Sequence, residues 1–399
     1  MIFRSPPPAL IVVLSGMVAA LHIGKMPVAI PVLTEALDIS LLDAGFLLSL
    51  VQFAGMTLGV FLGLFCDRIG YRRSVISGQL LLALAGLGGA MTQRADLLML
   101  LRAFEGLGFF LVVLPSPALL RQLVPPAGLT TILGWWGTHM GTGAAVAILA
   151  GPALIHLAGW QGFWLILTGI SGLMAWALWQ YVPDLARPAV APADQSSSWN
   201  RLLLTLRQAG PWRCALAFAF YSSQWLAVIG FLPAIYSQAG LSSGVSGLLT
   251  AFACWVNITG SLLAGKLLHR GVAARTLLVT GYLTMAGTTF LTFSTLTQDW
   301  PVLRFIAVVL FSAVGGMIPG TLFSIAVKVA PNNQTIATTV GWMLQCSAAG
   351  QFFGPPVVAW IAAQAGGWHL TWLATCLSSF LGILMAWRLS LHAGAKRKT

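Results

Sequence analysis

The chain has 399 residues, of which 58% are hydrophobic and only 8% are charged, and its formal net charge is +12. Soluble globular domains carry about a quarter of their residues as charged side chains, so this composition excludes a soluble protein and indicates an integral membrane protein. The five cysteines show no paired spacing and no CxxC. We therefore expect no disulfide framework, no metal site and no cofactor.

Apolar segments long enough to cross a membrane follow one another along the chain. A spanning helix needs about 20 predominantly apolar residues, and twelve segments meet that condition. In chain order they cover approximately residues 8–33, 43–66, 74–93, 96–120, 130–157, 160–182, 212–238, 243–267, 274–295, 300–328, 335–364 and 368–391. The first run is too long for the core of a signal peptide, so we expect it to remain as a span.

One long polar segment, rich in Pro, Ser and Ala, separates the sixth span from the seventh. Such a composition is typical of a linker. We expect a six-helix bundle over residues 1–182, a cytoplasmic linker over 183–211 and a second six-helix bundle over 212–399. The predicted fold class is an all-α membrane protein with twelve transmembrane helices in two pseudo-symmetric bundles.

The basic residues orient the spans. With the N-terminus inside, seventeen of the 21 lysines and arginines fall on the inner side, and only Arg94 falls on the outer side. This distribution predicts a multi-pass protein of a cell membrane, such as a bacterial inner membrane, with both termini cytoplasmic. Because the positive-inside rule explains the net charge, we expect membrane lipids and no nucleic acid as partners. We also expect a monomer.

The two halves resemble each other. The segment "PVLTEALDISLLDAG" (Pro31–Gly45) matches "PAIYSQAGLSSGVSG" (Pro233–Gly247), with the first proline and the last glycine fourteen residues apart in both. Arg102, near the start of the fourth span, parallels Arg304 near the start of the tenth. Parallel halves joined by a cytoplasmic linker indicate a repeat whose axis runs along the membrane normal.

The loop between the second and third spans carries the most specific motif, "GLFCDRIGYRRS". It resembles the loop signature of the major facilitator superfamily through Gly63, Asp67, Arg68, Gly70, Arg72 and Arg73. That resemblance implies the superfamily's fold and a gating role for Gly63, Asp67, Arg68, Arg72 and Arg73. The matching loop of the second half has His269 in place of Asp67, so the first half is expected to carry the gate. Topological anchoring by the arginines is the alternative.

Two further segments resemble motifs of the same family. "LRAFEGLGFF" is similar to the helix 4 motif through Arg102, Gly106 and Gly108, with Glu105 where an amide is commoner. The fifth span, "GTHMGTGAAVAILAGP", partly resembles the motif of the exporters, although its small residues also permit close helix packing. The helix 5 glycines and short termini resemble the cyanate permease-like branch. Motifs of hydrolases, metalloenzymes and nucleotide-binding proteins are absent from the sequence, and we expect no enzyme.

Four charged residues fall at membrane depth: Lys25, Arg102, Glu105 and Arg304. At 1.5 Å of rise per residue, Lys25 and Glu105 lie roughly 12 and 14 Å from the outer surface, near the midplane. His22 shares a helix face with Lys25, and Arg102 shares one with Glu105, by i,i+3 spacing. The family resemblance implies that Lys25 faces a water-filled central cavity, where it meets Glu105 or the substrate. The four charges sum to +2, which favours an anionic solute.

These residues define the expected site. The predicted substrate-binding residues are His22, Lys25, Arg102, His139, Gln224, Asn257 and Arg304. Snorkelling of Arg304 to the interface and packing of His139 are open alternatives. Glu105 is the predicted proton-coupling group, because it is the only acid at membrane depth. A permanent ion pair of Glu105 with Lys25 or Arg102 is the competing interpretation.

The sequence therefore predicts a secondary active transporter that moves a small anion by alternating access, coupled to protons. Its partners are the small-molecule anion, protons and lipids. Proton-coupled efflux of drug-like compounds is an alternative, although efflux of lipophilic cations calls for a negatively charged cavity. A membrane receptor that binds a ligand without moving it is a third reading, which the intact Asp67–Arg68 pair disfavours.

Overall fold

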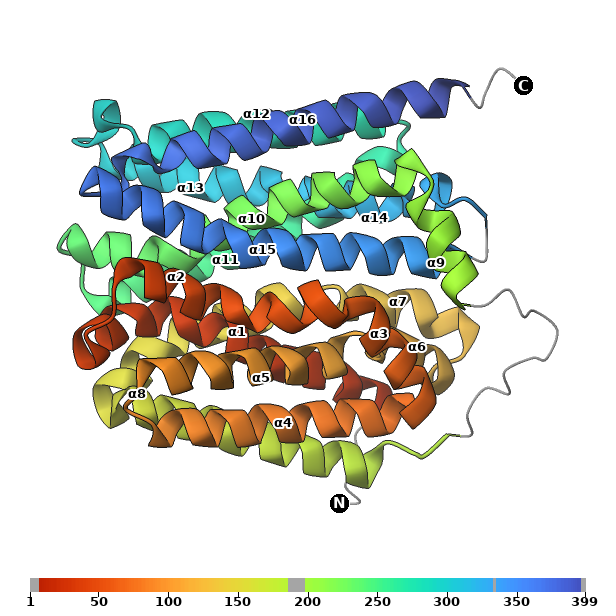
Figure 1. Ribbon diagram of the computed structural model, residues 1–399, viewed down its shortest axis with the longest axis horizontal. Coiled ribbons are helices and arrows are strands. Elements are labelled where there is room, and N and C mark those ends of the chain that lie inside the picture. Colours follow the sequence, from red (N-terminus) through yellow and green to blue (C-terminus); the bar gives the residue numbers. More distant parts are fainter. Residues whose placement is uncertain (1–6, 186–197, 333–334, 396–399) are drawn as a thin grey trace. The chain divides into compact units, whose positions relative to one another are not determined.

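The computed structural model describes residues 7–185, 198–332 and 335–395, and all regular structure in these ranges is helical (Figure 1). Contacts divide the chain into two compact units. Unit 1 consists of residues 1–40, 46–190 and 231–251, and unit 2 consists of residues 41–45, 191–230 and 252–399.

The helices of the first half are α1 (Pro8–Leu37), α2 (Leu41–Ser49), η1 (Leu50–Gln52), α3 (Phe53–Ile69), α4 (Tyr71–Met91), α5 (Ala95–Val113), α6 (Ser116–Leu123), α7 (Pro126–Trp136) and α8 (His139–Tyr181). Those of the second half are α9 (Ser198–Leu206), α10 (Ala209–Gln238), α11 (Ser243–His269), α12 (Ala274–Phe293), η2 (Thr295–Thr297), α13 (Pro301–Gly315), α14 (Met317–Val329), α15 (Ile336–Ala365), η4 (Trp368–Leu370) and α16 (Thr371–Ala395). The predicted linker thus contains a short helix, α9.

The twelve predicted spans are confirmed as helical segments. Ten stretches of the described chain are long and apolar enough to cross a membrane. One of them, Pro126–Tyr181, holds both the fifth and the sixth span, which meet at Gly159, where φ is +69°. The remaining span, the eleventh, is the 30-residue helix α15, which is not among these ten stretches. Glycine suits the kink at position 159 because a residue with a side chain is strained at positive φ.

Helix α1 packs against α8 with unusually close backbones in unit 1. A Cβ atom added to Gly24 would lie 2.3 Å from the carbonyl oxygen of Ala144, and one added to Gly143 would lie 2.3 Å from that of Met17. Only glycine permits such contact, which is how small residues bring membrane helices together. The small residues of the fifth span therefore serve helix packing in this structure.

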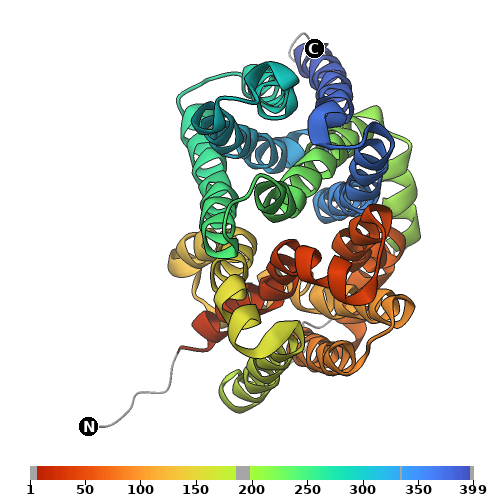
Figure 2. The same cartoon turned by 90° about the vertical axis from the view of Figure 1, so that its left-hand side faces the viewer.

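The remaining helices of each unit run alongside one another. In unit 1, α4 packs against both α5 and α8. In unit 2, α12 packs against both α13 and α16. Figure 2 shows the helices of this unit almost end-on. The packing of α1, α4, α5 and α8 encloses the buried charged residues of the first half.

Candidate functional site

Four ionisable side chains meet in the interior of unit 1: His22 and Lys25 on α1, and Arg102 and Glu105 on α5. We call them the charged cluster. Each has 2% or less of its surface exposed. The i,i+3 spacing predicted two pairs, each on one helix face, and the fold brings the two pairs together.

Glu105 is the centre of the charged cluster. Its Oε1 accepts a hydrogen bond from the ammonium of Lys25, and its Oε2 accepts one from Nη1 of Arg102 at 2.7 Å. The ammonium of Lys25 also lies 4.3 Å from the centroid of the Trp164 ring, within the range of a cation–π contact. The carboxylate therefore holds two cations at once.

Backbone carbonyls and a serine fix the other members of the cluster. Arg102 donates from Nη1 to the carbonyl oxygen of His22 at 2.5 Å and from Nε to that of Leu47 at 3.1 Å. The ring of His22 places Nε2 2.9 Å from Oγ of Ser171 and Nδ1 3.4 Å from Oε1 of Glu105. These contacts link α1, α5 and α8.

Two glycines of α4 leave the space that these side chains occupy. A Cβ atom on Gly86 would lie 2.7 Å from Oγ1 of Thr168 and 3.8 Å from Oε1 of Glu105. One on Gly89 would lie 2.9 Å from Nε1 of Trp164. A larger residue at Gly86 would push Thr168 from its place, and one at Gly89 would push Trp164 from its place.

The structure corrects one expectation for Lys25. We expected its ammonium to face a water-filled cavity, but the side chain is completely buried. Glu105 and the ring of Trp164 cover it, and both belong to unit 1. Of the two anions expected for Lys25, the one in place here is Glu105.

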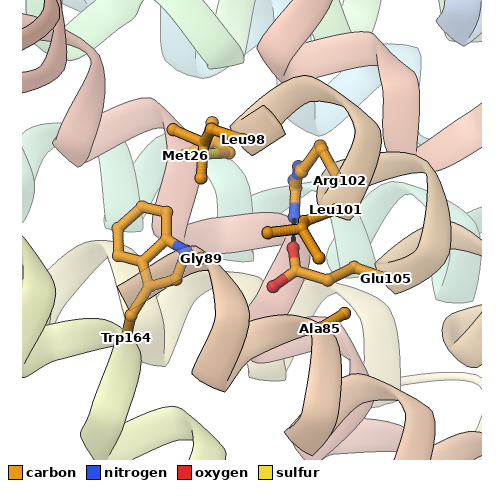
Figure 3. A pocket seen from close by; sticks show the side chains of 8 residues that line it. All are labelled: Met26, Ala85, Gly89, Leu98, Leu101, Arg102, Glu105 and Trp164. Carbon is orange, nitrogen blue, oxygen red and sulfur yellow. Dashed lines mark hydrogen bonds and ion pairs between the residues drawn. The ribbon is translucent and has the colours of Figure 1, made fainter. Parts of the chain in front are cut away.

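A narrow pocket adjoins the charged cluster (Figure 3). It is lined by Met26, Ala85, Gly89, Leu98, Leu101, Arg102, Glu105 and Trp164. Figure 3 shows Arg102 and Glu105 along one side and the indole of Trp164 on the other. Within the described ranges, no group of three or more His, Cys, Asp and Glu residues could hold a metal ion.

Sequence reasoning did not find Ser171 and Trp164. Trp164 is one of 16 tryptophans, and nothing in its neighbourhood sets it apart. The repeat contained a signal for the serine: Ser171 follows the Gly159–Trp160 pair, and Ser379 follows Gly367–Trp368, at the same distance. Ser379 donates a hydrogen bond to Oε1 of Gln224 at 3.1 Å.

Three predicted substrate ligands lie in helices of the second half. Gln224 is held by Ser379 and by the carbonyl oxygen of Phe220. Asn257 on α11 donates from Nδ2 to the hydroxyl of Tyr221 at 2.9 Å and to the carbonyl oxygen of Ser312 at 2.8 Å. These two side chains form an uncharged polar network in unit 2.

Arg304 and His139 each have contacts outside the charged cluster. Arg304 donates to the carbonyl oxygen of Ser294 at 2.6 Å and to Oγ1 of Thr297 at 3.3 Å. That contact with the segment between α12 and α13 agrees with the snorkelling alternative. His139 stacks on Trp136 and has Nδ1 2.6 Å from the Trp136 carbonyl oxygen, which agrees with a packing role.

The predicted gate residues lie at the end of α3 and the start of α4. Arg72 donates to the carbonyl oxygen of Trp179, near the end of α8, at 2.5 Å. Arg73 forms an ion pair of 3.5 Å with Asp184, whereas Arg68 is exposed. Gly63 and Asp67 lie in α3, and their surroundings are outside what the structure describes.

Comparison with known proteins agrees with this architecture. The family model of the Major Facilitator Superfamily matches residues 9–350. The solved structure of a D-xylose-proton symporter superposes with a TM-score of 0.77 at 16% identity, covering 96% of this chain and 97% of the other. A bacterial homologue of the human lysosomal transporter Spinster gives a TM-score of 0.74 at 16% identity, covering 98% and 96%.

The named sequence relatives match only part of this chain. The multidrug transporter MdfA of Edwardsiella piscicida is 27% identical over 213 residues, 53% of this chain and 51% of the relative. The cis,cis-muconate transport protein of Acinetobacter baylyi is 31% identical over 165 residues, 40% of each chain. The cyanate transport protein CynX of Escherichia coli K12 is 25% identical over 256 residues, 63% of each chain. The chain spans about half the length of the first of these relatives.

The fold and the family match define a class: a multi-pass membrane protein of a family of transporters, not of enzymes. More specifically, the chain belongs to the Major Facilitator Superfamily.

Proposed function

We propose that this protein moves a small anion across the membrane by alternating access and that the charged cluster couples this movement to protons. The observation that carries the proposal is the composition of that cluster, in which two cations, Lys25 and Arg102, share one carboxylate, Glu105. With His22 neutral, the cluster has a net charge of +1 in the interior of a membrane domain.

Burying charge at this depth costs several kcal/mol per ion unless partners compensate for it. Glu105 compensates for one of the two cations. An anion that reaches the cluster supplies the missing negative charge, whereas a cation adds to the excess. The cluster therefore favours anions as substrates. Alternating access moves the two bundles against each other, and the proposal requires that Glu105 and Trp164, which cover Lys25 within unit 1, move aside when the substrate enters.

Proton coupling follows from competition for the same two cations. When a substrate anion binds Lys25 or Arg102, Glu105 loses part of the positive charge that keeps it ionised. A proton then replaces the lost cation on Glu105, and the anion and the proton move together. We propose Lys25, His22 and Arg102 as the substrate-binding residues and Glu105 as the coupling residue. The competing account is a permanent structural ion pair around Glu105.

Two of the sequence relatives support an anionic substrate. By their names they transport cis,cis-muconate and cyanate, both of which are anions at neutral pH. The gate of this transporter is proposed at Gly63, Asp67, Arg68, Arg72 and Arg73, on the cytoplasmic side, with both termini cytoplasmic. Gln224, Asn257, His139 and Arg304 stay predictions as additional substrate contacts.

Efflux of drug-like compounds is the second candidate, and the similarity to MdfA favours it. The charged cluster argues against lipophilic cations, since its excess charge repels them. That argument applies to cations only, so neutral drugs remain candidate substrates for efflux.

Transport by the purified protein in proteoliposomes tests the proposal. Labelled cyanate, formate and cis,cis-muconate are supplied with and without an inward pH gradient, beside a neutral sugar and a lipophilic cation such as tetraphenylphosphonium. Accumulation of at least one anion that follows the pH gradient supports the proposal. Movement of the lipophilic cation or of neutral drugs alone, with no anion moved, overturns it and favours efflux.

A further inference from the structure

We infer that the end of unit 2 at which α10 and α12 begin and α16 ends binds the phosphate group of an anionic phospholipid. The binding groups are the guanidinium groups of Arg213 on α10, Arg275 on α12 and Arg388 on α16, and the indole of Trp387 borders the site. Three observations lead to this site: contacts that gather the arginines, a near absence of acidic residues from this half, and an apolar stripe on α16.

Two of the arginines contact consecutive residues of α16. Arg213 donates from Nη1 to the carbonyl oxygen of Arg388 at 3.2 Å. The guanidinium carbon of Arg275 lies 5.0 Å from the centroid of the Trp387 ring, within the range of a cation–π contact. Figure 1 shows α12 and α16 side by side. Topological anchoring requires only that basic residues lie on one side of the membrane, so it does not explain why three helices gather them in one place.

Acidic residues are almost absent from the second half of the sequence. Between residues 198 and 399 the only one is Asp299, which follows η2. The 20-residue helix α12 separates it from Arg275 by about 30 Å. Lys266 and Arg270, at the end of α11 and directly after it, add further positive charge just before α12. The second half therefore has no acidic side chain to offer these cations, and the anions that a membrane supplies are the phosphates of its anionic lipids.

The exposed face of α16 is apolar along its length. Leu373, Leu377 and Phe380 are between 45% and 64% exposed, and their spacing of four and three residues puts them on one side of the helix. Trp387, seven residues further on, continues this stripe toward the arginines and is half exposed. From Leu373 to Trp387 the helix rises about 21 Å, a large part of the hydrocarbon core of a bilayer. The acyl chains of the lipid lie along this stripe.

Trp387 sets the depth of the phosphate group. Tryptophan side chains are enriched where the hydrocarbon core meets the headgroups, and the guanidinium of Arg275 lies against this ring. Arg388 is the next residue and is exposed. Guanidinium groups bind phosphate oxygens through two parallel N–H donors, and basic pockets between membrane helices bind the headgroups of anionic lipids. The phosphate of a lipid whose chains cover α16 thus lies at the level of both arginines.

Native mass spectrometry of the full-length protein in detergent measures the binding. Protein freed of copurified lipid is titrated with phosphatidylglycerol, beside phosphatidylcholine with the same acyl chains, whose headgroup has no net charge. We expect phosphatidylglycerol to bind more tightly by roughly tenfold or more, because each arginine attracts a negatively charged headgroup. Glycerol 3-phosphate has the charge without the chains and should compete roughly a hundredfold more weakly than the lipid.

Two variants test the charge. Arg275→Gln and Arg388→Gln each remove one cation and should weaken binding of phosphatidylglycerol about fivefold, which corresponds to about 1 kcal/mol for one basic residue near an anionic surface. Arg121→Gln, in the last turn of α6, removes the same charge in unit 1 and is the matched control. It should bind the lipid like the wild type.

Trp387→Leu tests the contact, because it keeps every charge and removes the ring that positions Arg275. We expect binding about two- to fivefold weaker, the value of an exposed cation–π contact. Trp360→Leu on α15, where the tryptophan is 55% exposed, controls for the loss of an exposed indole and should not alter binding. All these side chains are exposed, so the variants should fold. Should one of them fail to fold, the others still decide the matter.

Loss of binding in Arg275→Gln, Arg388→Gln and Trp387→Leu, with both controls unchanged, supports the site. Equal binding of phosphatidylglycerol and phosphatidylcholine by the wild type would overturn it. Equally strong competition by glycerol 3-phosphate would assign the arginines to a soluble phosphate and also overturn it. The same holds if Arg121→Gln weakens binding as much as Arg275→Gln while Trp387→Leu has no effect, since that result indicates a diffuse attraction. The transported anion is not part of this experiment, so the proposed function stands or falls separately.

Discussion

The interiors of the two units share a polar frame and differ in charge. In unit 1, His22 on α1 is hydrogen bonded to Ser171 on α8, at 2.9 Å. In unit 2, Gln224 on α10 accepts a hydrogen bond from Ser379 on α16, at 3.1 Å. These residues occupy matching places in the sequence repeat, so a matching contact joins the first span of each half to its last span.

Among the residues that the structure describes, the buried Lys, Arg and Glu side chains all lie in unit 1. The positions that correspond to Lys25 and Glu105 in the second half are Ala227 and Ala307, and both alanines are buried. The second half therefore builds a comparable helical interior without an ion pair. Replacing a buried ion pair by apolar residues is often neutral or stabilising. Because the fold does not need these charges, the comparison favours a functional reason for them.

Lys25→Ala makes unit 1 match unit 2 at this position, and we expect the largest effect from it. The variant should fold and insert, because Glu105 keeps its ion pair with Arg102. Substrate affinity should fall by roughly 100-fold, the value of about 3 kcal/mol for a lost hydrogen bond between charged groups. Binding of the transported anion to purified protein measures it.

Lys25→Arg, which keeps the charge, is the control for Lys25→Ala and should retain part of the affinity. A Lys25→Ala protein that binds the anion as tightly as the wild type would show that Lys25 only neutralises Glu105. The difference in charge between the units would then be structural.

Glu105→Gln should separate exchange from coupling. The amide cannot take up a proton, so exchange of labelled for unlabelled anion is expected to continue, whereas accumulation driven by a pH gradient should disappear. The variant also leaves Lys25 and Arg102 without their carboxylate, a change that costs about 3–5 kcal/mol in a buried pair. The substrate anion should therefore raise the melting temperature of this variant more than that of the wild type.

Ala307→Gln in unit 2 is the matched control for Glu105→Gln and should leave the pH dependence unchanged. Accumulation by Glu105→Gln with the normal pH dependence would assign the coupling to another residue and support a permanent ion pair.

Asp67→Asn tests whether the gate also belongs to the first half, whose repeat partner has His269. Removing the carboxylate charge from the proposed gate should slow exchange about tenfold and change substrate affinity by less than about twofold. Exchange rates and equilibrium binding are measured on the same preparation, with His269→Asn as the control. A proportional fall of both quantities would mean that Asp67 acts through the binding site or through stability.

Most of the fold was predictable because hydrophobic length dominates the behaviour of a chain in a membrane. The ends of the helices were not. Helix α1 runs four residues past the predicted end at 33, through polar residues, until Asp38 adopts a left-handed conformation with φ of 47°. The η1 break at Leu50–Gln52 interrupts an apolar run, and hydropathy carries no signal for such a break.

The site was predictable in part. Spacing along a helix placed His22 beside Lys25 and Arg102 beside Glu105, since i,i+3 neighbours share a face. Whether the two pairs face each other, a cavity or the bundle interior depends on the rotation of α1 and α5, which the spacing of residues does not determine. The cover that Trp164 forms over Lys25 depends on the same packing.

The smallest effect is expected where the two units already agree. His22→Gln gives unit 1 the side chain found in unit 2, and a glutamine amide can keep a hydrogen bond to Ser171 as Gln224 does with Ser379. We expect the free energy of unfolding to change by less than about 1 kcal/mol, the value of one neutral hydrogen bond. His22→Leu has a similar volume but no polar atom, and it leaves Ser171 without this partner in a buried place. Its cost should be larger by about 1–3 kcal/mol.

Melting temperatures of the two variants, with Gln224→Leu as the corresponding measurement in unit 2, make the comparison. A His22→Gln protein as unstable as His22→Leu would show that the imidazole has a role in the charged cluster that a neutral amide does not reproduce. In that case the shared frame would not be equivalent in the two units, and His22 would belong with Lys25 and Glu105 to the part that distinguishes them.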